Sequence, residues 1–181
     1  MKIKFKPVCI FLLVFTSLYQ QSALSSETKK YSNDHLGFEV SYLDKWKTAS
    51  TPSNPALFIK RESSVDPVTI LIAVANFTGN KKKLMRELRD KPELLATSFK
   101  RNFPDTELVG HRDTSLAGVP AYVIDVKFTA VTENGNMAIS AMSLTCIKNK
   151  KLYLIQFRAP QSIFENMLTE VQLILATFKF L

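Results

Sequence analysis

Residues 120–159 read PAYVIDVKFTAVTENGNMAISAMSLTCIKNKKLYLIQFRA, and this stretch decides the fold. Apolar and polar side chains alternate along most of it, which is typical of β-strands, and two short polar segments interrupt the alternation. The first interruption contains Asn134 and Gly135, which accept the positive φ of a two-residue turn. The second, residues 148–150, is another tight turn. Three consecutive antiparallel strands are therefore predicted, at residues 120–131, 137–148 and 152–159.

The same two-residue period occurs in four segments ahead of this stretch. The turn-forming residues Asn33, Asp34 and Gly37 divide residues 31–47 into two short strands. Residues 68–77 are apolar at nearly every position, which is typical of a central strand buried on both faces. Further strands are predicted at residues 56–62 and 107–117.

Residues 81–103 change to a period near 3.6, which is typical of an amphipathic helix. Pro92 interrupts this pattern. Because Asp90 can cap a helix and proline suits a first helical turn, one short helix is predicted to end near Asp90 and a second to begin near Pro92. The apolar side chains at the helical period are Leu84, Leu88, Leu95 and Phe99.

The C-terminal segment carries the clearest helix pattern. Pro160 ends the last predicted strand, and Ser162 with Glu165 has the spacing of a capping box. The apolar stripe that follows is long and regular, which favours packing against the sheet over binding a partner. This stripe consists of Phe164, Met167, Leu168, Val171, Ile174, Leu175 and Phe178.

The order of the predicted elements indicates the fold class. Strands come first, then a helical segment, then a run of hairpin-linked strands, and a helix closes the chain. Because strands and helices occur in separate blocks, the sequence predicts an α+β fold rather than a doubly wound parallel one. We expect an antiparallel β-sheet sandwiched by helices.

The first 25 residues differ in character from the rest of the chain. Three lysines form a positively charged head, and an uncharged apolar run follows at residues 8–19. This run is shorter than the roughly 20 residues of a membrane-spanning helix. Ala23 and Ser25 then supply the small residues of a signal-peptidase site. The sequence therefore predicts a signal peptide at residues 1–25, cleaved after Ser25 or, as the alternative, after Ala23.

Residues 26–181 are expected to form one globular domain, exported to the periplasm or secreted, with no transmembrane helix after cleavage. The chain is 46% hydrophobic and 22% charged, which is the composition of a folded protein and not of a disordered one. Loss of the three lysines of the signal segment lowers the formal net charge from +8 by three. The remaining positive charge is mild.

The sequence predicts no catalytic, cofactor-binding or metal site. It contains no nucleophile elbow, zinc-protease helix, Walker loop or dinucleotide fingerprint. Its two histidines, His35 and His111, each lie in a polar local setting. Asp34 and Glu39 lie near His35, but this group is better interpreted as a solvated turn than as a ligand set.

Two other side chains, Cys146 and Asp125, are possible reactive groups. Cys146 alternates with Met142 and Leu144, which indicates a small buried hydrophobe rather than a reactive thiol. Asp125 lies in an otherwise apolar strand, and pairing with Lys127 two residues along the same face would explain it.

Basic residues cluster at the start of the helical region. A nucleic-acid interface usually pairs such a cluster with aromatic side chains or a known motif, which this chain lacks, so no nucleic-acid partner is predicted. A solvated helix face is favoured. If the cluster is functional, an anionic membrane surface or an acidic protein is the expected target. The cluster consists of Lys81, Lys82, Lys83, Arg86, Arg89 and Lys91.

Three short segments carry a family resemblance. Residues 37–42 (GFEVSY) run into Trp46, residues 116–121 (LAGVPA) form a turn before a long strand, and residues 153–157 (YLIQF) precede the closing helix. In this combination the chain resembles the PsbP/Mog-type fold family, which includes DcrB-like exported bacterial proteins. The resemblance implies an antiparallel sheet between helices that serves as a binding or assembly platform without catalysis. The chain departs from the family at Leu43, where members usually have proline, and in lacking the lipid-anchor cysteine of DcrB-like members.

The sequence thus favours an exported, non-enzymatic accessory or binding protein of the bacterial cell envelope or secretome. Its expected partner is a protein or an envelope component. Two alternatives remain open. One is a small exported enzyme of hydrolase type built on His35, His111 or Asp125, which would need at least two of these side chains in one pocket. The other is a secreted factor that acts on a host or a competitor.

Overall fold

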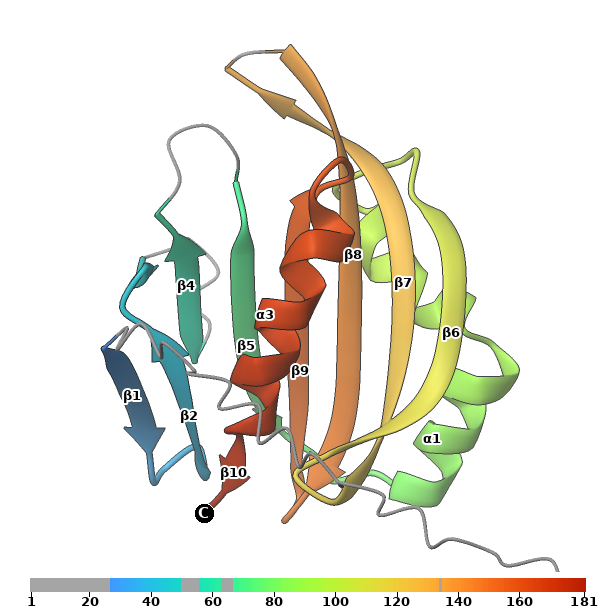
Figure 1. The fold of residues 1–181 in the computed structure, drawn as a ribbon. Helices are drawn as coiled ribbons and strands as arrows, with labels where there is room; N and C mark the ends of the chain where they lie inside the picture. Colours follow the sequence, from blue (N-terminus) through green and yellow to red (C-terminus); the bar gives the residue numbers. More distant parts are fainter. Residues whose placement is uncertain (1–26, 50–55, 63–66, 134) are drawn as a thin grey trace, which may run out of the picture.

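The computed structural model describes residues 27–49, 56–62, 67–133 and 135–181. The predicted signal segment, residues 1–25, and Asn134 lie outside these residues. Every strand pair in the described part of the chain is antiparallel, and the strands form two sheets (Figure 1). In spatial order, the larger sheet contains β3 (Trp46–Thr48), β4 (Leu57–Arg61), β5 (Thr69–Asn76), β9 (Lys151–Pro160), β8 (Gly135–Lys148), β7 (Val119–Thr132) and β6 (Glu107–Leu116).

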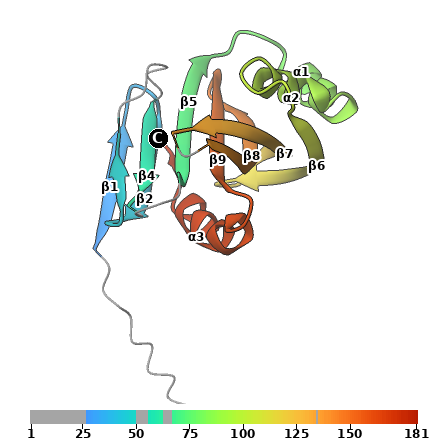
Figure 2. The same cartoon turned by 90° about the horizontal axis from the view of Figure 1, so that it is seen from above.

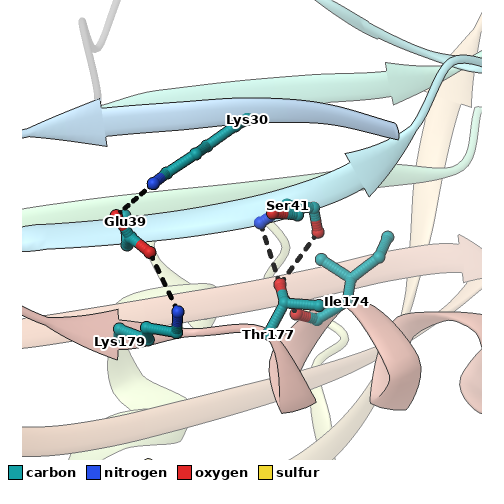
Figure 3. Close-up of polar contacts among 6 residues, drawn as sticks. All are labelled: Lys30, Glu39, Ser41, Ile174, Thr177 and Lys179. Carbon is teal, nitrogen blue, oxygen red and sulfur yellow. Dashed lines mark hydrogen bonds and ion pairs between the residues drawn. The ribbon is translucent and has the colours of Figure 1, made fainter. Parts of the chain in front are cut away.

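The smaller sheet joins the C-terminus to the first hairpin of the described chain. Its strands, in spatial order, are β1 (Thr28–Asn33), β2 (Phe38–Leu43) and β10 (Lys179–Phe180). Glu39 on β2 pairs with Lys30 of β1 at 2.6 Å and with Lys179 of β10 at 3.3 Å (Figure 3). The Ser41 amide donates to the Thr177 hydroxyl at 2.8 Å, and that hydroxyl lies 3.0 Å from the Ser41 carbonyl oxygen. These contacts hold the end of the chain against β2.

Helices cover both faces of the larger sheet, as the sequence predicts. α1 (Lys81–Asp90) and α2 (Glu93–Lys100) pack on one face against β6 and β7. α3 (Phe164–Ala176) packs on the other face against β9 and also contacts β2 (Figure 2). The fold is therefore an α+β fold with an antiparallel sheet between helices.

The hairpins follow from local turn geometry. Lys148 pairs with Lys151 across a turn in which Asn149 and Lys150 have φ values of 50° and 58°. At the other end of β8, Thr132 pairs with Gly135, whose φ is 105°. A two-residue turn whose twist matches that of the flanking strands requires positive φ at both central residues, so Asn149 and Lys150 fix the register of the β8–β9 hairpin. Gly135 instead begins β8, so the prediction that it is one of the two turn residues was wrong by one position.

Two apolar clusters hold the layers together. The larger lies between α3, the smaller sheet and one face of the larger sheet, and it includes Trp46 and Val171, both 0% exposed. The smaller lies between α1, α2 and the opposite face, where Ile124 is fully buried. Each fully buried large apolar side chain contributes about 1.5–3 kcal/mol relative to exposure, so the two clusters fix which faces the helices cover.

The prediction that β5 is buried on both faces was wrong. β5 is an interior strand, between β4 and β9. Ile70 and Ile72 on one face are each 1% exposed, whereas Leu71 on the other face is only half-buried. The reason is the position of α1 and α2, which cover β6 and β7 and leave β5 without a helix on that face.

The predicted capping box at Ser162 was also wrong. α3 begins at Phe164, and its N-cap is Ile163, which makes no side-chain hydrogen bond to the helix. Instead, Phe164 stacks on Phe157 of β9 with the ring centroids 4.9 Å apart. Packing of this aromatic pair fixes the start of the helix in place of a polar cap.

Candidate functional site

Polar contacts of Glu170 hold one side of α3 against the rest of the protein. The indole Nε1 of Trp46 donates to Glu170 Oε1 at 2.5 Å. Glu170 Oε2 pairs with Lys45 Nζ at 2.8 Å and lies 3.7 Å from Arg61 Nε. Because buried polar groups are costly when unpaired, these contacts with β3, β4 and the turn that precedes β3 hold the helix on this side.

The other long side of α3 borders open space above the sheet. In Figure 1, α3 lies in front of β9, while β6 and β7 lie to its right with no helix before them. Two neighbouring cavities, of about 350 and 320 Å³, occupy this region. We call them together the α3–β6 groove. Its defining residues are Val109, Arg112, Thr114 and Leu116 of β6, Asp125 of β7, Met142 of β8, and Leu168, Gln172, Leu175 and Ala176 of α3.

Arg112 lines both cavities and marks the middle of the groove. Its guanidinium Nη1 pairs with Asp125 Oδ2, and Nη2 lies 3.8 Å from the sulfur of Met142. The expectation that Asp125 pairs with Lys127 was therefore wrong. Neighbouring antiparallel strands bring diagonal side chains on one face within reach of each other, and Arg112 uses that reach from β6.

The groove combines apolar walls with further polar side chains. Thr114, Ser115 and Gln172 line one cavity, and Lys127, Ser140 and Glu165 line the other. Leu168 and Leu175 of α3 are half-buried, and each lines one of the two cavities. Leu116 and Met142 are buried at the floor of the cavity near the end of α3. A groove with both apolar and polar walls suits a chain-like ligand that carries both kinds of group.

One wall of the groove is also the edge of the larger sheet. β6 is the last strand in the sheet order, and its outer side has no strand partner among the described residues. A β-bulge lies between Leu108 and Gly110, and Val109 there is 51% exposed. Edge strands offer free backbone donors and acceptors, and bulges occur often beside binding sites.

The structure does not gather the histidines and acids that the sequence analysis considered. His35 lies exposed in the turn between β1 and β2, and its carbonyl oxygen accepts from Lys151 Nζ. Glu39 is engaged by two lysines and forms no group with His35. His111 is exposed on β6, where its Nδ1 lies 2.8 Å from the Tyr122 hydroxyl.

The alternation of side chains along the strands places His111 and Asp125, two possible catalytic residues, on opposite faces of the larger sheet. His111 contacts Tyr122, which belongs to the cluster under α1 and α2, whereas Asp125 shares the opposite face with Val123. Cys146 is 0% exposed beneath α3. No group of three or more histidine, cysteine, aspartate or glutamate side chains that could hold a metal occurs in the described ranges.

None of the helices in the part of the chain that the structure describes has the length and apolar character needed to cross a bilayer.

The arrangement of these elements is that of a PsbP-like fold. The chain is similar to the solution structure of cyanobacterial PsbP (CyanoP) from Synechocystis sp. PCC 6803, with a TM-score of 0.58 and 12% identity over 88% of this chain and 96% of that one. It is also similar to LpqN, described as involved in cell envelope biogenesis of Mycobacterium tuberculosis, with a TM-score of 0.57 and 12% identity over 84% and 90% of the two chains. The likeness shows the fold.

A third similar structure, from Bacteroides thetaiotaomicron VPI-5482, gives a TM-score of 0.53 with 13% identity over 84% of this chain and 48% of that one. No family model matches the sequence, and no curated protein matches it. The expected resemblance to PsbP-type folds is thus confirmed at the level of structure.

The groove was missed by the sequence analysis, although one signal for it exists. The two-residue turn at Ala117 and Gly118 sets the register of the β6–β7 hairpin, which places Gly110 opposite Asp125. Arg112 then lies two positions along the same face. The contribution of α3 to the groove depends on packing between distant segments and has no local signal.

Proposed function

We propose that this chain is an exported, non-enzymatic accessory protein of the bacterial cell envelope that binds a protein partner in the α3–β6 groove. One observation carries the proposal. A trough with apolar and polar walls, centred on the Arg112–Asp125 pair, runs beside the free edge of β6. Such a site presents backbone groups and side-chain pockets to the same ligand.

Other observations support this class of function. His111 and Asp125 lie on opposite faces of the sheet, and Cys146 is enclosed in the core, so these side chains do not form a catalytic group. The signal-peptide pattern of residues 1–25 supports export. LpqN, which shares the fold, is described as involved in cell envelope biogenesis.

The proposed partner presents an extended segment. The segment adds a strand to the edge of β6, and alternate side chains enter the two cavities. Leu168 and Leu175 contact its apolar groups. Arg112 remains 49% exposed in its side chain, so its unpaired guanidinium hydrogens can meet a carbonyl or carboxylate of the partner.

The test is site-specific photo-crosslinking in cells that produce the protein. A crosslinking residue at Thr114, which is exposed and lines the groove, is expected to capture one partner. The same residue at Thr97, exposed on α2 over the opposite face, is expected to capture none. Filling the cavity by Ala176→Trp should reduce the Thr114 product at least tenfold.

Leu173→Trp is the matched control for this variant. Leu173 also lies on α3 and is 66% exposed, but it does not line the groove. The Thr114 product should stay unchanged in this control. Equal crosslinking from Thr97 and Thr114, or equal losses in the two tryptophan variants, would contradict binding in the groove.

A further inference from the structure

The basic cluster at the start of the helical region is placed on an exposed helix face. Lys81, Lys82 and Arg86 of α1 are exposed, and no ion pair involves them within the described ranges. By contrast, Lys83 lies 3.8 Å from Glu87, and Arg89 pairs with Asp113 at 2.7 Å. Part of the cluster is therefore neutralised by neighbours, whereas Lys81, Lys82 and Arg86 are not.

Two further lysines, from a distant part of the sequence, lie beside the first turn of α1. A cavity of about 210 Å³ is lined by Lys81 and by Lys148 and Lys150 of the β8–β9 turn. The Phe77 amide donates to the Lys150 carbonyl at 2.7 Å, which ties the two segments together. In Figure 1 both lie at the lower end of the larger sheet, where α1 begins. We call this cavity the lysine pocket.

The lysine pocket has the chemistry of an anion site. All three lysines are exposed, and none has a carboxylate partner in the part of the chain that the structure describes. Phe77 and Ile147 supply apolar walls beneath them. Like charges gathered around one cavity repel one another, so the arrangement gains stability when an anion enters.

We propose that the lysine pocket binds the phosphate of an anionic phospholipid, with the exposed face of α1 lying along the membrane surface. Charge complementarity favours a membrane over a small anion. The unpaired cations extend beyond the pocket to Lys82 and Arg86, which lie one turn apart on α1, a helix of ten residues that is about 15 Å long. A planar surface with many negative charges engages all of them at once, whereas a single phosphate engages only the pocket. The proposal does not depend on the α3–β6 groove.

The test uses flotation of the purified protein with phosphatidylcholine vesicles, with and without phosphatidylglycerol. Binding is expected only when phosphatidylglycerol is present, and it should weaken as salt is raised. The double variant Lys148→Gln/Lys150→Gln should bind about 30-fold more weakly, because each lysine near an anionic surface contributes about fivefold. Lys81→Gln is a second variant on a separate element and should lose about fivefold.

Lys29→Gln/Lys60→Gln is the matched control. Both lysines are exposed, lie on β1 and β4, and have no ion pair among the described residues, so the net charge changes equally away from the pocket. Binding should stay within about twofold of the parent. Equal losses in the control and pocket variants, or equal binding to both vesicle types, would overturn the proposal. Release by inorganic phosphate at constant ionic strength would instead assign the pocket to free phosphate and would also overturn it.

Discussion

At the scale of single residues, the thiol of Cys146 is enclosed on the face of β8 that α3 covers. Burial raises the pKa of this thiol to about 12, and the positive charge of Lys81 opposes the shift only in part. Because the thiolate is the reactive form, the folded protein holds Cys146 in its unreactive form at neutral pH.

We predict that Cys146 in protein lacking residues 1–25 reacts with iodoacetamide at pH 8 at least a hundredfold more slowly when folded than when unfolded in urea. The raised pKa alone lowers the thiolate fraction by roughly a thousandfold, and burial adds a barrier to access. Mass spectrometry of the alkylated chain at timed intervals measures the rate. Similar rates in the two states would show that the thiol is accessible.

The same pKa shift predicts a loss of stability at alkaline pH. The unfolded thiol ionises near pH 9, whereas the folded thiol stays protonated to about pH 12. Above pH 9 the unfolded state therefore binds fewer protons than the folded state, and the free energy of unfolding falls as pH rises toward 12. Cys146→Ala should show a smaller fall over this range in urea-unfolding curves. An equal fall in both proteins would exclude Cys146 as a cause.

At the scale of elements, α3 has two apolar sides with different roles. Val171 is 0% exposed in the larger core cluster, whereas Leu168 is half-buried and lines the α3–β6 groove. The apolar stripe that the sequence assigns to core packing is therefore divided between the core and the groove. Each turn of the helix contributes to both.

Val171→Asp and Leu168→Asp should consequently differ in stability. Val171→Asp places an unpaired carboxylate in the core and is expected to lower the free energy of unfolding by about 3–5 kcal/mol. Leu168→Asp leaves the carboxylate at the groove, where water reaches it, and should cost less than half as much. Urea unfolding followed by circular dichroism measures both values. Equal costs would mean that the two positions are buried alike.

At the scale of the whole molecule, the proposed domain of residues 26–181 is bounded by the predicted signal segment. We expect the exported protein to begin at Ser26, or at Leu24 if cleavage follows Ala23. Intact mass of the protein from separated periplasm, membrane and culture medium tests this expectation. A product that retains residues 1–19 would contradict export by cleavage, and recovery mainly from the medium would favour the secreted-factor alternative.

Much of the architecture was predictable because its causes are local. The alternation in residues 120–159 and the positive-φ turn at Asn149 and Lys150 depend on neighbouring residues alone, and they predict the consecutive hairpins that the structure contains. The break at Pro92 likewise separates α1 from α2 where the sequence indicates. By contrast, β10 is a two-residue strand that exists only through its pairing with Glu39 and Phe38, so it has no period to recognise.

The sequence by itself therefore determined the types of the longer elements, the antiparallel hairpins and the α+β class, since each depends on side chains within a few residues of one another. The tertiary structure alone decided which halves of the sheet the helices cover. It also decided that α3 lies beside β6 across one groove, and that Lys81 joins Lys148 and Lys150 around one cavity. These contacts join segments that are far apart in the chain. Their geometry depends on how the layers pack, which cannot be predicted from the local periodicity of the sequence.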